Sequence, residues 1–279
     1  MKVVLFCGGM GLRLREADER LPKPLIPVGE APILLHLMKY YAHYGHTDFV
    51  LCLGHKAHAI KEYFLNYNEA LQNDFVLEPG GQEVRLLKKD IEGWRISFVY
   101  TGRTASIGER LLAVREHLRG EDYFLANYGD QLTDAPLPAL IERLKAEDKV
   151  ASLLTVPPPY STHTIQLGED GCVDEVAPMN DGSLWINGGF FVFRHDLFDY
   201  MRPGEDLVEE PFHRLIAERQ LLGVRYEGFW APMDTLKDKQ QLDTLAESGC
   251  PPWAVWLRDD AANERPALSV VPPPIGLSA

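Results

Sequence analysis

A cluster of glycines and cationic residues near the start of the chain has the composition of an anion-binding loop. An apolar run at 3–7 leads into three glycines and two cations: Gly8, Gly9, Gly11, Arg13 and Lys23. Glycines let the main chain approach a ligand closely and turn its N–H groups toward it. The two cationic side chains would meet the same anion, so the pattern predicts a phosphate site.

Two other loop types also contain glycines, so the cluster alone is weak evidence. They are a dinucleotide-binding turn and an ordinary junction between a strand and a loop. The spacing here is G-G-x-G-x-R, and Arg13 stands where the dinucleotide fingerprint has its last glycine. No GK[ST] follows to form a nucleoside-triphosphatase loop. The spacing therefore favours a phosphate loop of another class.

Two carboxylates at the ends of predicted elements are candidate metal ligands. Asp130 follows a strand predicted at 123–126, and Asp234 precedes a helix predicted at 235–246. Mg²⁺ prefers one or two carboxylates together with phosphate oxygens and water. Each residue also has a simpler interpretation, Asp130 as a turn residue and Asp234 as the N-cap of its helix. The glycine loop in the same chain is what favours the metal hypothesis.

The segment LWINGGFFVF places Asn187, Gly188 and Gly189 inside an otherwise apolar strand. Glycine weakens a strand interior, so the pair indicates either a β-bulge or the close approach of a ligand. The sequence favours neither alternative.

Short strands and helices alternate along the first half of the chain. Strands are predicted at 2–7, 48–53, 95–100, 123–126 and 150–156, and helices at 31–44, 57–67, 107–118 and 136–146. This order is typical of an α/β fold with a doubly wound, mostly parallel sheet, which binds ligands at the carboxyl ends of its strands. The glycine loop lies at such an end. Residues 68–94 break the rhythm and are expected to form an excursion or a small hairpin at the sheet edge.

The second half of the chain is richer in proline and in β-type alternation. From residue 157 this composition predicts a smaller β-rich subregion at 157–206 that closes over the pocket. A helix, a strand and a closing helix are predicted at 207–219, 222–226 and 235–246. We therefore expect one domain at 1–256 and a proline-rich tail at 257–279 that is flexible or straps a neighbouring subunit.

Composition restricts the partners and the compartment. With 28 Lys and Arg against 41 Asp and Glu, the net charge is −13. Nucleic acids and anionic membranes require a basic face, so we expect neither as a partner. Four widely spaced cysteines indicate neither a disulfide framework nor a zinc site, and we expect them to be buried apolar residues. The first apolar run is too short for a signal sequence or a membrane span, which favours a cytoplasmic location.

Several segments, in order along the chain to about Trp256, resemble the sugar-1-phosphate nucleotidylyltransferases, above all their glucose-1-phosphate cytidylyltransferase branch. They are CGGMGLRL, PKPLIPVGEAPILLHLMKYYAHYGHTDFVLCLGHKAHAIKEYF, NYGDQLTD, INGGFFVF and EEPFHRLIAERQLLGVRYEGFWAPMDTLKDKQQL. The glycine loop is common to many nucleotidylyltransferases, whereas HYGHTDFVLCLGHKAHAIKEYF and GFWAPMDTLKDK are specific to the cytidylyl branch. The resemblance implies a Rossmann-like nucleotidyltransferase domain at 1–256. It also implies a Mg²⁺-dependent reaction of CTP with a sugar 1-phosphate that gives CDP-sugar and pyrophosphate.

The resemblance also implies roles for single residues. Arg13 would hold the leaving pyrophosphate, and Lys23 would bridge the α-phosphate and the attacking phosphate. Asp130 and Asp234 would hold Mg²⁺. The nucleotide would contact Cys7, Gly8, Gly9, Gly11, Gly129 and Arg110, the last near the cytosine carbonyl. The phosphorylated acceptor would contact Tyr128, Asn187 and Gly188, and the assembly would be a homo-oligomer.

The chain departs from the family pattern mostly on the acceptor side. Leu12 replaces a threonine of the loop, Val176-Ala177-Pro178 replaces E-K-P, and Glu109 and Gln131 replace glycines. The missing lysine of E-K-P would remove a charge-assisted hydrogen bond of about 1.5 to 3 kcal/mol. The acceptor is thus glucose 1-phosphate or another phosphorylated or phosphonylated small molecule. A weakly active nucleotide-binding homologue is a third alternative, disfavoured because Arg13, Lys23 and both aspartates are kept.

Overall fold

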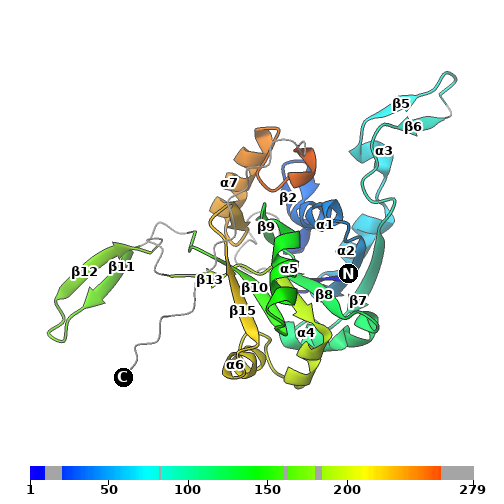
Figure 1. The fold of residues 1–279 in the computed structure, drawn as a ribbon. Helices are drawn as coiled ribbons and strands as arrows, with labels where there is room; N and C mark the ends of the chain where they lie inside the picture. Colours follow the sequence, from blue (N-terminus) through cyan, green and yellow to red (C-terminus); the bar gives the residue numbers. More distant parts are fainter. Residues whose placement is uncertain (10–20, 82, 160–162, 180–183, 259–279) are drawn as a thin grey trace.

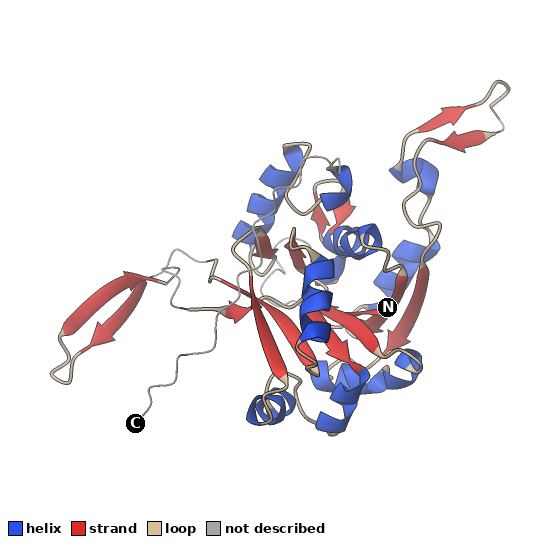
Figure 2. Cartoon of the chain, in the orientation of Figure 1, coloured by secondary structure: helices blue, strands red, loops and turns tan. Residues whose placement is uncertain are grey.

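The computed structural model describes residues 1–9, 21–81, 83–159, 163–179 and 184–258. Gly11, Leu12 and Arg13 of the predicted phosphate loop therefore lie outside the described residues, as does the predicted tail from residue 259 on. Within the described residues, eight strands form a central sheet with helices on both faces (Figures 1 and 2). These strands are β1 (Val3–Cys7), β4 (Asp48–Leu53), β7 (Arg95–Tyr100), β8 (Tyr123–Tyr128), β10 (Ala151–Val156), β13 (Ile186–Asn187), β14 (Phe191–Arg194) and β15 (Leu221–Arg225).

The sheet is mostly parallel, and the order of its strands is β13-β10-β14-β8-β1-β4-β7, with β15 paired to β10. Strand β1 runs parallel to both β4 and β8, and β4 runs parallel to β7. Strand β14 runs antiparallel between β8 and β10. The carboxyl ends of β1, β4, β7 and β8 consequently meet at one edge, which confirms the doubly wound architecture expected from the sequence.

Both faces of the sheet are covered by helices. Val3 and Leu5 point into one core with α1 (Ile33–His43), α2 (Ala57–Leu65) and α5 (Leu137–Ala146). Val4 and Phe6 point into a second core with α4 (Ile107–Ala113) and α6 (Glu210–Ala217). Every residue of β1 is buried, as expected for a central parallel strand. The glycine loop is thus attached directly to a fully buried strand.

Several predicted helices are shorter in the structure, and for two of them the structure shows the cause. The helix predicted at 31–44 begins only at Ile33, because Ala31 and Pro32 form β3 (Ala31–Pro32), paired with β2 (Pro27–Val28). The helix predicted at 107–118 ends at Ala113 and continues as the 3₁₀ helix η3 (Arg115–Leu118). Other helical elements of the described chain are η2 (Lys23–Leu25), η4 (His195–Tyr200), α7 (Leu236–Glu247) and η5 (Val255–Leu257).

Two hairpins project from the body in different directions (Figure 1). The first confirms the hairpin expected at 68–94 and contains α3 (Glu69–Gln72), β5 (Phe75–Leu77) and β6 (Val84–Leu86). The second contains β11 (His163–Leu167) and β12 (Val173–Pro178). The range 157–206 is thus divided, because β13 and β14 belong to the central sheet and only β11 and β12 stand apart.

The four cysteines fall into two classes. Cys7 and Cys52 lie buried in central strands, as expected, whereas Cys172 and Cys250 are exposed. The prediction that all four are buried is therefore wrong for the latter two, which lie in turns after Gly171 and Gly249. None of the helices in the described part of the chain is long and apolar enough to cross a membrane.

Candidate active site

Arg110 is buried beneath the loops at the carboxyl ends of three parallel strands. Its guanidinium donates to the main-chain oxygens of Gly8 at 3.1 Å and Gly102 at 2.9 Å, and to the hydroxyl of Thr101 at 2.9 Å. A longer bond of 3.4 Å reaches the oxygen of Leu53. The residue is 3% exposed, so these partners replace water around the charge. Arg110 thereby ties together the ends of β1, β4 and β7.

The position of Arg110 also explains Gly8. A Cβ added at Gly8 would lie 2.0 Å from Nη1 of Arg110, which no real side chain can do. A side chain at Gly8 would therefore displace the guanidinium from its bonds to the three strand ends. At the neighbouring Gly9, an added Cβ would meet no described atom within 4 Å, so this exposed glycine leaves the main chain open to a ligand. The hydrogen bonds of Arg110 all end on the protein, and its predicted contact with a nucleobase is untested.

Lys23 joins the two aspartates that the sequence singled out. Its Nζ lies 2.6 Å from Oδ2 of Asp130 and 2.6 Å from Oδ1 of Asp234. Burial alone would lower the pKa of Lys23, but the two carboxylates outweigh it and raise that pKa. Lys23 is thus a cation held between two anions, with its side chain 14% exposed.

The pairing of two short strands, which we call the ladder, brings together Asp130 and Asp234, which lie far apart in the sequence. Strands β9 (Gln131–Thr133) and β16 (Trp230–Pro232) pair antiparallel, with Gln131 opposite Pro232. The N–H of Met233 then donates to the oxygen of Asp130 at 2.9 Å. Asp130 precedes β9 and Asp234 follows β16, so both carboxylates emerge at the same end of the ladder.

Asp234 does not cap the helix that follows it. The N-cap of α7 is Thr235, whose hydroxyl accepts from the N–H of Asp238 at 3.2 Å. The carboxylate of Asp238 accepts in return from the N–H of Thr235 at 2.8 Å, which completes a capping box. The interpretation of Asp234 as a helix cap is therefore wrong, and its carboxylate binds Lys23 instead.

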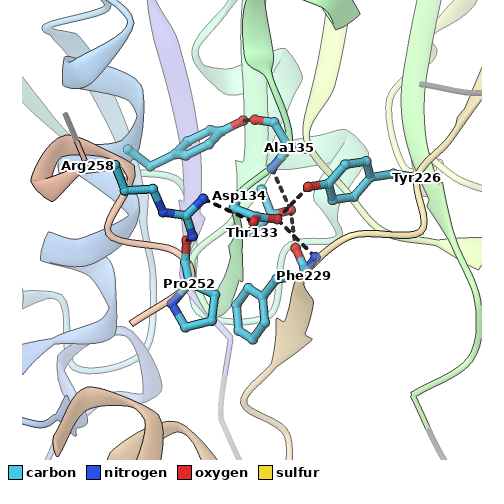
Figure 3. Close-up of polar contacts among 8 residues, drawn as sticks. Thr133, Asp134, Ala135, Tyr226, Phe229, Pro252 and Arg258 are labelled. Carbon is cyan, nitrogen blue, oxygen red and sulfur yellow. Dashed lines mark hydrogen bonds and ion pairs between the residues drawn. The ribbon is translucent and has the colours of Figure 1, made fainter. Parts of the chain in front are cut away.

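A third carboxylate, Asp134, holds together the two strands of the same ladder (Figure 3). Its Oδ1 accepts from the hydroxyl of buried Tyr226 and, at 2.9 Å, from the N–H of Phe229. Its Oδ2 faces Arg258 at 3.4 Å. The hydroxyl of Thr133 donates to the oxygen of Phe229 at 2.7 Å. These bonds hold β9 against the segment that enters β16, and so fix the spacing of Asp130 and Asp234. Sequence analysis missed this cluster, because no local pattern pairs Asp134 with Tyr226.

Tyr128 and Asn187, two of the predicted acceptor-binding residues, are in contact with each other. Nδ2 of Asn187 donates to the hydroxyl of Tyr128 at 3.3 Å. Burial raises the pKa of Tyr128 to about 12, so its hydroxyl stays protonated at neutral pH. The oxygen of the third predicted residue, Gly188, accepts from the indole of Trp230 at 2.8 Å, which connects this corner to β16. Cys7 is buried beside Gly129, and burial raises the pKa of its thiol.

The glycine pair of INGGFF forms the break between β13 and β14. Gly189 has φ +70°, and an added Cβ would lie 2.3 Å from Oδ1 of Asn127 and 2.4 Å from Oε1 of Gln131. The same Oδ1 of Asn127 accepts from the N–H of Phe190 at 2.9 Å. The backbone break therefore explains Gly189 without a ligand.

Gly189→Ala is expected to lower the free energy of unfolding by about 1 to 3 kcal/mol, because it adds a clash to a left-handed backbone. Urea denaturation measures this loss. Gly204→Ala is a matched control, since Gly204 has φ +86° and its added Cβ meets no described atom within 4 Å. If the two variants lose the same stability, the contact with Asn127 and Gln131 does not matter.

A pocket of about 400 Å³ opens beside the glycine edge, between the loops that follow β4 and β7. Its lining includes His55, Lys56, Tyr100 and Arg103. Cationic side chains next to an exposed aromatic ring suit a ligand that carries both a ring and phosphates.

The two aspartates fit a divalent cation only with help from other ligands. Among the described residues, no three His, Cys, Asp or Glu side chains gather closely enough to hold a metal ion. Asp130 and Asp234 supply hard oxygens within reach of a single cation, as their shared contact with Lys23 demonstrates. Mg²⁺ uses one or two carboxylates plus phosphate oxygens and water, so this donor set suits it when a phosphorylated substrate is bound.

The chain is similar to several known proteins. Residues 2–232 match the family model described as nucleotidyl transferase. The chain is 37% identical over 259 residues to glucose-1-phosphate cytidylyltransferase of Salmonella typhi, covering 92% of this chain and 100% of that protein. It is 25% identical to mannose-1-phosphate guanyltransferase of Schizosaccharomyces pombe, over 85% of this chain and 62% of that protein. The fold is similar to that of HddC from Yersinia pseudotuberculosis, with a TM-score of 0.60, 15% identity, and coverage of 87% and 98%.

Proposed function

Because the chain belongs to the nucleotidyl transferase family, we propose that it is a cytidylyltransferase that joins CTP to a sugar 1-phosphate and releases pyrophosphate. The identity to a glucose-1-phosphate cytidylyltransferase over that protein's whole length supports the choice of CTP. The observation that carries the chemistry is the cluster of Lys23, Asp130 and Asp234 at the carboxyl edge of the sheet. A cation and two hard-oxygen ligands are what a reaction between two phosphate groups requires.

In this reaction a phosphate oxygen of the acceptor attacks the α-phosphorus of CTP. The new P–O bond forms as the bond between the α-phosphorus and the bridging oxygen breaks, and pyrophosphate leaves with that electron pair. The protein has no proton to remove from an ionised phosphate, so its contribution is positioning and neutralisation of charge. The open main chain at Gly9 would approach the nucleotide, and Lys23 would neutralise the reacting phosphates.

Asp130 and Asp234 would hold Mg²⁺ beside Lys23. When bound, the ion screens the repulsion between the two anionic reactants. The hydrogen bonds of Asp134 hold β9 against the segment before β16. The spacing of Asp130 and Asp234 at the end of this strand pair therefore does not depend on the ligand. The pocket that contains Tyr100 and Arg103 is the place we assign to the rest of the nucleotide.

The test is pyrophosphate release with CTP and Mg²⁺ against a panel of acceptors. The panel contains glucose 1-phosphate, other sugar 1-phosphates and small phosphonates, and UTP replaces CTP in parallel reactions. Turnover with CTP and a sugar 1-phosphate supports the proposal. CTP binding without pyrophosphate release from any acceptor would contradict it and favour a binding protein.

A second candidate is the same chemistry on a different phosphorylated or phosphonylated acceptor. The observation that favours it is Ala177, which lies in β12 where the family has a lysine for the sugar phosphate. Ala177 pairs with Thr164 of β11, whose hydroxyl donates to its oxygen at 3.2 Å. Turnover with a panel member other than a sugar 1-phosphate would support this candidate.

Ala177→Lys is expected to raise kcat/KM for glucose 1-phosphate about tenfold or more, since a charge-assisted hydrogen bond to phosphate contributes about 1.5 kcal/mol or more. Steady-state kinetics measures the change. Val176→Lys adds the same charge on the opposite face of the same strand and is expected to have no such effect. Equal behaviour of the two variants would show that only the net charge of the hairpin matters.

A further inference from the structure

Lys23 lies between the two oxygens that the proposed function assigns to a metal ion. We propose that the ammonium of Lys23 is the counter-ion of Asp130 and Asp234 until a divalent cation displaces it, and that this displacement delivers Lys23 to the phosphates. The inference rests on the proposed function for the metal role of the aspartates. It adds that the metal ion and Lys23 compete for the same two carboxylates, so that metal binding releases Lys23 to the phosphates.

The geometry makes the lysine and the metal alternatives at one position. Nζ of Lys23 is 2.6 Å from an oxygen of each carboxylate, which is short for a hydrogen bond from an ammonium. A dication bound to the same two oxygens would face the ammonium across a few ångströms. Like charges at that separation repel strongly inside a protein. One of the two cations therefore has to leave.

The backbone around Lys23 indicates that only its side chain moves. Pro22 and Pro24 flank it, and proline fixes the backbone angle φ at its own position. The N–H of Leu25 donates to the oxygen of Pro22 at 2.8 Å, and that of Ile26 to the oxygen of Lys23 at 3.1 Å. Buried Pro24 also packs against Gly129. A flexible four-carbon stem on a fixed backbone can move the ammonium from the carboxylates to a nearby phosphate.

The displacement couples the metal to the nucleotide. Without the metal, the charge of Lys23 is neutralised by two carboxylates and is not available to phosphates. With the metal bound to those carboxylates, the same charge is released at the place where the substrates meet. By linkage, phosphate that binds Lys23 must strengthen metal binding to the same extent. Lys23 is thus a ligand-exchange partner of the metal site as well as a phosphate ligand.

The test is the affinity for Mn²⁺ without nucleotide, measured by electron paramagnetic resonance of the free ion. Mn²⁺ serves as the probe because it takes the same oxygen ligands. Lys23→Met removes the competing charge and keeps most of the length of the side chain. We expect it to bind Mn²⁺ at least about tenfold more tightly than the unmodified protein. Lys239→Met is the matched control, since Lys239 also pairs with an aspartate, Asp243, and we expect its affinity to be unchanged.

Thermal unfolding gives a second measurement. Lys23→Met leaves two carboxylates facing each other, so Mn²⁺ should raise its unfolding temperature more than that of the unmodified protein. Equal Mn²⁺ affinity in both proteins, with normal CTP turnover by the unmodified one, would overturn this inference alone. If neither protein binds Mn²⁺, even with CTP, the metal role in the proposed function fails and the inference fails with it.

Discussion

Asp234→Asn is expected to lower kcat by about 10²-fold or more while the protein stays folded, because one charged ligand beside the reacting phosphates is lost. The amide is close in shape to the carboxylate, and its oxygen can still accept from Lys23. The side chain of Asp234 is 37% exposed, so the change in stability is expected to stay within about 1 kcal/mol. Pyrophosphate release at increasing Mg²⁺ concentration, together with a thermal unfolding curve, measures both effects.

The matched control is Asp243→Asn. Asp243 lies on α7, pairs with Lys239 and has a side chain 31% exposed, so the substitution removes a comparable ion pair away from the candidate site. We expect this variant to keep its turnover. Undiminished activity in Asp234→Asn would remove Asp234 from the metal site. A loss in both variants would instead indicate a general effect of reducing the negative charge on this side of the molecule.

Local patterns were sufficient for the elements that carry the candidate site. The buried run of β1, the alternation of strands and helices, and the glycines at a strand end all depend on neighbouring residues, and the structure confirms the strands and the sheet. The pairing of Asp130 with Asp234 was a hypothesis from the residues themselves, and the family resemblance added the role of Lys23 between the reacting phosphates. The contact itself depends on the pairing of β9 with β16, which no periodicity in either segment specifies.

Three residues have partners that their own sequence surroundings do not indicate. Asp234 has the position of a helix cap, but the capping box of Thr235 and Asp238 already satisfies the end of α7. Asp134 looks like an ordinary loop residue, and its partner Tyr226 lies far along the chain. The helical spacing around Arg110 does not indicate a buried charge either. A signal does exist in retrospect, since the glycines that follow β1, β4 and β7 surround its guanidinium.

Arg110→Met is expected to lower the free energy of unfolding by about 3 kcal/mol, because the oxygens of Gly8 and Gly102 lose a charged donor in a buried place. The loops after β1, β4 and β7 would also lose their common partner, so kcat/KM should fall with every nucleotide. Since the donors of Arg110 bond to the protein itself, we expect the ratio of CTP to UTP use to stay unchanged. Urea denaturation and kinetics with both nucleotides measure the two effects.

Arg115→Met separates the loss of this buried cation from a general effect of the substitution. Arg115 begins η3, two residues after the end of α4 at Ala113, and is exposed, with its guanidinium 5.2 Å from the ring centre of Phe198, so we expect only a small loss of stability and unchanged kinetics. A relaxed preference for CTP in Arg110→Met, beyond its loss of stability, would mean that the guanidinium also reads the base. An equal fall with CTP and UTP would mean that Arg110 acts by holding the ends of three strands in place, and that base selection belongs to other residues of the nucleotide pocket.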